Sequence, residues 1–90
     1  MFKVERNEDV EQIALRISGR MQAPHLAELQ AEMNPAAKRI ILDLEELRLI
    51  DRDVVLFLCN FERSGVELRN CPWFIREWMF QEIRKQKDAE

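Results

Sequence analysis

Five carboxylates lie close together in the middle of the sequence, at Asp43, Glu45, Glu46, Asp51 and Asp53. General acid–base catalysis would need two of them to converge in a pocket that shifts their pKa values. The surrounding pattern gives them simpler roles. Asp51 precedes a helical stretch that it can cap, and Asp53 falls in the first turn, where a negative charge suits the helix dipole. Glu45 and Glu46 are expected in a loop, so we expect no catalytic residues and no enzyme.

The residues that bind metals best are few. His25 is the only histidine, and it shares one edge of an expected helix with Glu28 and Glu32. A structural zinc site needs three or four converging ligands, and Cys59 and Cys71 match no such spacing. Buried free thiols are the simpler interpretation. The sequence has only two glycines, so it holds no glycine-rich phosphate loop, and we expect no metal and no cofactor.

The composition is typical of a small globular domain. The chain has 90 residues, of which 47% are hydrophobic and 34% charged, enough for one compact core. A net charge of -3 without a long basic run argues against nucleic acid as a partner. No apolar stretch approaches the roughly 18–20 residues that span a bilayer, and the first residues resemble no signal peptide. We expect a cytoplasmic protein without membrane insertion, with a single domain over 1–90 and a solvated end over 84–90.

Strand and helix patterns alternate along the chain. Alternating apolar and polar residues indicate half-buried strands, and apolar residues at helical spacing indicate amphipathic helices. The expected elements are strands at 2–6 and 13–18, a helix from Pro24 to Asn34, a strand at 38–44, a helix from Asp51 to about Arg63, a strand at 66–69 and a helix from Pro72. The order β-β-α-β-α-β-α predicts an α/β fold with a mixed four-stranded sheet.

The two later helices carry more apolar side chains than one face can bury. In the first of them, one stripe should face the sheet and consists of Val54, Phe57, Leu58 and Phe61, whereas the roughly opposite side holds Val55, Leu56 and Cys59. In the last helix, a broad core face consists of Phe74, Ile75, Trp78, Met79 and Ile83, and the far side holds Trp73, Phe80 and Arg84. Either neighbouring helices bury the extra groups, or they anchor a partner or a second copy.

Three segments together form a family pattern. Ile40-Ile41-Leu42-Asp43-Leu44 is followed by Leu47, Ile50-Asp51 and a helix, Gly65 leads a last strand over 65–69, and Ser18-Gly19 ends a strand before the first helix. This pattern resembles the STAS domain, the fold of bacterial anti-sigma-factor antagonists, over roughly residues 2–83. The resemblance implies helices mainly on one face of the sheet and a protein-interaction module that regulates transcription by docking rather than by catalysis.

The resemblance fails at one informative position. Family members that dock on an anti-sigma kinase carry the motif Asp-Ser-Ser-Gly, and phosphate on the first serine blocks docking. Here the motif reads Asp51-Arg52-Asp53-Val54. Arg52 cannot accept a phosphate, which would add about −1.5 to −2 charges. The sequence therefore predicts a module that phosphorylation at this position does not switch.

The resemblance places a docking surface at the start of the helix after Asp51, made of Asp51, Arg52, Asp53, Val55, Leu56 and Cys59. The partner would be an anti-sigma factor or, as for some small STAS proteins, the ATPase subunit of a transporter. Trp73 and Phe80 could instead join two copies in a homodimer. A different class also remains open, a small-ligand or lipid-binding domain whose apolar cavity would be lined by Phe57, Trp78 and Met79.

Overall fold

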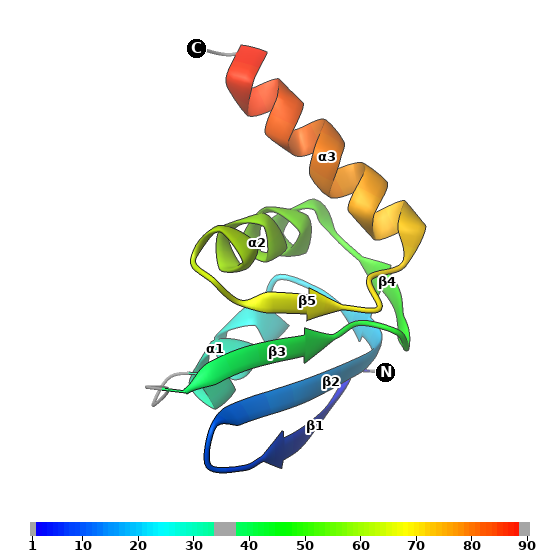
Figure 1. Ribbon diagram of the computed structural model, residues 1–90. Helices are drawn as coiled ribbons and strands as arrows, with labels where there is room; N and C mark the ends of the chain where they lie inside the picture. The colour runs from blue at the N-terminus through cyan, green and yellow to red at the C-terminus, as the bar shows by residue number, and fades with distance from the viewer. Residues whose placement is uncertain (1, 34–37, 89–90) are drawn as a thin grey trace.

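The computed structural model describes residues 2–33 and 38–88 and contains one mixed sheet and three helices (Figure 1). The fold class predicted from the sequence is confirmed. In chain order the elements are β1 (Lys3–Glu8), β2 (Gln12–Met21), α1 (His25–Met33), β3 (Arg39–Asp43), β4 (Leu47–Ile50), α2 (Arg52–Arg63), β5 (Glu67–Arg69) and α3 (Trp73–Asp88).

The sheet is organised around β2. β1 pairs with it antiparallel, and β3 pairs with it in parallel, with β5 parallel to β3 on the outer side. Because β2 is longer than β3, its last residues would be left without a neighbour on that side. β4 takes this place and pairs with β2 from Gly19 to Met21.

β4 is a fifth strand, in a segment where the sequence predicts a loop. The chain leaves the sheet after Asp43 and rejoins it at Glu46, whose carbonyl oxygen accepts a hydrogen bond from the Gly19 amide at 3.1 Å. Gly19 has φ of 87°, and the register shifts between Gly19 and Arg20. A positive φ is costly for other residue types, which explains glycine at this bulge. Leu47, the first residue of β4, is buried in the core.

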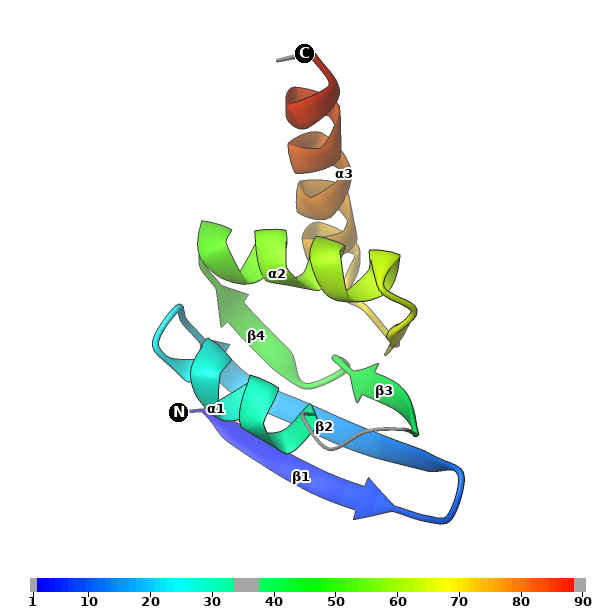
Figure 2. The ribbon, with the colours of Figure 1, turned by 90° about the vertical axis from the view of Figure 1, so that its left-hand side faces the viewer.

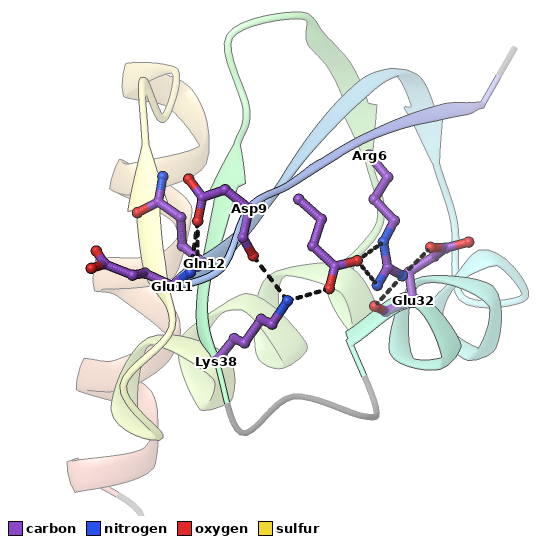
Figure 3. Close-up of polar contacts among 7 residues, drawn as sticks. Arg6, Asp9, Glu11, Gln12, Glu32 and Lys38 are labelled. Atoms are coloured by element: carbon purple, nitrogen blue, oxygen red, sulfur yellow. Dashed lines mark hydrogen bonds and ion pairs between the residues drawn. The ribbon is translucent and has the colours of Figure 1, made fainter.

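Ion pairs fix the end of the sheet where β1 turns into β2 (Figure 3). This end is the one away from Met21, the last residue of β2. The Lys38 ammonium lies 2.6 Å from the Glu8 carboxylate and donates to the Asp9 carbonyl at 2.9 Å. Arg6 contacts Glu8 at 2.7 Å and the Glu32 carboxylate of α1 at 2.9 Å. These contacts connect β1 to the end of α1 and to the start of β3.

One face of the sheet carries the core. α1 and α2 both pack on the face to which Ile13, Leu15 and Ile17 of β2 point, and Leu29 and Leu58 belong to the same cluster. The other face carries the exposed Lys3, Glu5 and Arg16, together with the buried Ile41 of β3. The sequence prediction that the helices lie mainly on one face is therefore confirmed.

α3 packs on α2 rather than on the sheet, and Figure 2 shows it rising from α2 away from the strands. We expected Val55 and Cys59 either to be buried by a neighbouring helix or to form part of the docking surface; they are buried, and the Cys59 Sγ lies 3.8 Å from the Met79 carbonyl oxygen. The buried face of α3 is also narrower than expected. Phe74 and Ile83 are exposed because α3 covers a helix and not a broad sheet.

Candidate docking surface at the start of α2

Asp51 caps α2 and ties two loops together. Its Oδ1 accepts the backbone N–H of Val54 at 3.1 Å, as an N-cap does, which confirms the cap expected from the sequence. Its Oδ2 accepts the backbone N–H of Ala23 at 3.0 Å, in the segment between β2 and α1. Both carboxylate oxygens are therefore occupied by the scaffold. Asp51 therefore has a structural role that positions the surface.

Arg52 connects the first turn of α2 to α3. Its Nε lies 3.0 Å from Oε1 of Glu82, while its side chain stays 66% exposed. Glu82 is only 3% exposed, and its second oxygen lies 3.3 Å from the Trp78 indole nitrogen and 3.5 Å from the Lys85 ammonium. The hydrogen bond from Arg52 is the main reason that the pKa of Glu82 lies below its ordinary value.

Glu82 was not among the residues predicted to have a role. The signal was present, because Glu82 follows Ile75 and Met79 at helical spacing and so falls on the buried stripe of α3. An acid on such a stripe requires a cationic partner. Identifying Arg52 as that partner needed the three-dimensional arrangement, since the two residues lie on different helices.

A groove runs between α1 and α2 beside the exposed Asp53. Its first hollow has a volume of about 370 Å³ and shows Leu56 and Phe57 of α2 facing Ala27 and Gln30 of α1. A second hollow of about 540 Å³ shares Ala27 and Gln30 and extends along the same two helices. We call this the α1–α2 groove, lined by Ala23, Leu26, Ala27, Gln30, Ala31, Met33, Asp53, Leu56, Phe57, Asn60 and Phe61.

The α1 side of the groove was also missed from the sequence. Ala23, just before α1, and Ala27 and Ala31 of α1 recur at every fourth residue, so small side chains follow one side of this segment and leave space next to α2. This spacing was a usable signal. Of the six residues expected at the docking surface, the structure gathers Asp51, Arg52, Asp53 and Leu56 at one end of α2, and buries Val55 and Cys59 on another side.

The cavity expected for a ligand-binding domain does not form from the residues named for it. Phe57 lines the α1–α2 groove, whereas Met79 is buried in the contact between α2 and α3. Trp78 lies beside Glu82 on α3. The three side chains thus belong to different parts of the molecule, and none of the hollows found over 2–33 and 38–88 joins them.

The remaining reactive groups are placed for structure. Burial is the largest effect on both thiols and raises the pKa of Cys59 and of Cys71, which makes them weak nucleophiles at neutral pH. Across the described ranges, no three His, Cys, Asp or Glu side chains gather as metal ligands. In the same part of the chain, each helix is too short or too polar to cross a membrane.

The architecture is similar to that of a known structure. The crystal structure of the STAS domain of an anti-sigma-factor antagonist from Rhodobacter sphaeroides aligns with a TM-score of 0.52 and 18% sequence identity, and covers 76% of this chain and 83% of that chain. This likeness defines a STAS-like fold. No protein-family model matches the chain, and no curated protein matches it.

Proposed function

We propose that residues 1–90 form a non-catalytic STAS-type interaction module that docks a protein partner at the start of α2. The observation that carries the proposal is the α1–α2 groove, which opens directly beside the exposed Asp53 and the half-buried Leu56. A groove with apolar walls and a few polar groups suits a protein segment with one apolar anchor. We place this docking in the cytoplasm.

The docking residues differ from those expected from sequence. We propose Asp53 and Leu56 of α2 with Ala27 and Gln30 of α1 as the contact surface. Arg52, which precedes Asp53 in the chain, is 66% exposed but does not line the groove. Val55 and Cys59 support α3 and take no direct part.

We infer that docking is constitutive at this site. Arginine carries no hydroxyl that could take a phosphate, and Arg52 is already held by Glu82 at 3.0 Å. The sequence also has no threonine and no tyrosine, and its serines are Ser18 and Ser64, neither of which lies in the groove. An anti-sigma factor is the partner that the similar structure suggests.

A permanently competent surface also suits a second partner, the ATPase subunit of a transporter. An accessory subunit stays bound through many transport cycles and needs no phosphate switch. The fixed Arg52–Glu82 contact favours such a role as much as it favours an anti-sigma-factor antagonist. A small ligand or lipid is less favoured because the residues expected to line its cavity lie apart.

The test is affinity co-purification from the source cell with Leu56→Glu beside the wild type, followed by mass spectrometry. The matched control is Val10→Glu, because Val10 is 90% exposed at the hairpin turn, at the other end of the sheet. We expect an anti-sigma factor or an ATPase subunit to bind wild type and Val10→Glu and to be lost with Leu56→Glu. Equal recovery by all three proteins would show that the groove is not the docking site. Circular dichroism establishes that Leu56→Glu remains folded.

A further inference from the structure

α3 presents an apolar face that residues 2–33 and 38–72 do not cover. Trp73 is 80% exposed, Phe80 is 58% exposed and Ile83 is 38% exposed. At about 100° per residue, Trp73 and Phe80 lie roughly opposite Ile75, whose side chain packs into the core. Burying such side chains in water-free contact is favourable, and aromatic groups are the usual anchors of interfaces.

The charges that flank this face are self-complementary. Glu77 and Arg84 are seven residues apart, so they lie on the same side of α3 two turns from one another. If two copies of α3 lie antiparallel and cross between Phe80 and Gln81, Glu77 of each copy lies opposite Arg84 of the other. A parallel pairing would instead place like charges together. The neighbouring Arg76 adds no unpaired cation, because Glu62 of α2 holds it at 2.8 Å.

We propose that a second copy of this chain covers α3, in an antiparallel homodimer built on Trp73, Phe80 and Ile83. Arg84 already lies over the Phe80 ring, 6.0 Å from its centroid, so the cation and the aromatic anchor form one unit on each copy. The pairing is antiparallel because Glu77 and Arg84 then form two equivalent ion pairs across the two-fold axis.

The dimer leaves the α1–α2 groove open. Leu56 and Asn60 line the groove, whereas Val55 and Cys59 contact α3, and these pairs lie on different flanks of α2. Each dimer thus carries two grooves, and a partner with two docking segments would gain affinity from both. The proposal does not depend on what occupies the groove.

The exposed apolar area of α3 limits how tightly the two copies can bind each other. Complete burial of an aromatic side chain removes about 150–250 Å², so the two partly exposed rings offer less than the roughly 800 Å² per partner that stable complexes bury. We expect a weak dimer with a dissociation constant on the order of 10–100 μM. Sedimentation equilibrium with the full chain at concentrations up to about ten times that range covers the transition.

The test reverses each charge separately. Glu77→Arg and Arg84→Glu should each raise the dimer dissociation constant at least tenfold, because each creates two like-charge contacts. An equimolar mixture of the two variants should associate again, since one copy then carries two cations and the other two anions. Controls of the same charge change lie outside α3, at Glu28→Arg on α1 and Arg63→Glu on α2, both exposed in the wild type, and should behave as wild type.

A wild-type chain that stays monomeric at the highest concentration overturns the proposal. So does a dimer that both variants leave unchanged, or a variant mixture that fails to associate. Trp73→Ala with Phe80→Ala supplies an independent check, because it removes the apolar anchors without changing charge and should also abolish the dimer. Loss of partner binding in Leu56→Glu with the dimer intact would separate this surface from the docking groove.

Discussion

Arg52 and Glu82 form an ion pair between the first residue of α2 and the third turn of α3, with 3.0 Å between Nε and Oε1. Arg52 therefore connects the two helices, and its substitution should disturb the packing of α3 as well as the start of α2. We propose that this residue stands where switchable family members carry a serine.

Arg52→Glu should lower the melting temperature by several degrees, and by more than Arg52→Ala. The reason is that a second carboxylate would then face Glu82 in a site with little water. Thermal unfolding of the two variants measures the difference. Adding Glu82→Gln to Arg52→Glu should recover the extra loss; if it does not, the two side chains do not interact.

Acid should remove the contribution of this ion pair. The folded pKa of Glu82 lies below its ordinary value, mainly because of Arg52, whereas the unfolded chain has the ordinary value of about 4.3. The stabilisation is complete above that value and is lost as pH falls through the lower folded pKa. Urea unfolding from neutral pH downward should show wild type and Glu82→Gln converging in acid. A constant gap between them would contradict the assignment.

Asp51→Ala should cost about 2–3 kcal/mol of unfolding free energy, since it removes an N-cap and leaves the Ala23 amide without its acceptor. Asp51→Asn should cost less, because its amide oxygen can still accept from Val54. Urea denaturation of both variants provides the measurement. Equal losses in the two would mean that capping is not the main role of Asp51.

Thiol labelling should report the docking of α3. Cys59 is buried beneath Met79 and Cys71 is only half-buried, and burial raises the pKa of both. We expect a neutral alkylating reagent to modify Cys71 first. Arg52→Glu should accelerate the labelling of Cys59, because loosening of α3 exposes it. Peptide mass spectrometry follows each cysteine separately. Unchanged Cys59 labelling would show that the ion pair does not hold α3.

The local patterns predicted most of the elements. Alternation identified β1 and β2, the capping of Asp51 located the start of α2, and both depend on residues near one another in sequence. β4 was missed because the excursion through Glu45 and Glu46 hides a four-residue strand. β4 pairs with β2, which is distant from it in sequence. The need for such a strand becomes apparent only when the structure shows that β3 is too short to pair with the last residues of β2.

The candidate site was predicted in part. The helical period identified two apolar sides of α2 but grouped Leu56 with Val55 and Cys59, whereas Leu56 lines the α1–α2 groove and the other two are buried. The position of α3 depends on the direction in which the chain leaves β5. The α1 wall of the groove and the buried Glu82 depend on the same tertiary information.

The central position of β2 also affects how the chain emerges from the ribosome. The β1–β2 hairpin is complete by Met21, but the parallel partners of β2 begin only at Arg39 and end at Ile50. Until those residues are synthesised, one edge of a ten-residue strand is unpaired and open to other chains. Crowded synthesis should therefore favour aggregation of incomplete chains, because α1 packs on a face of β2 and leaves that edge uncovered.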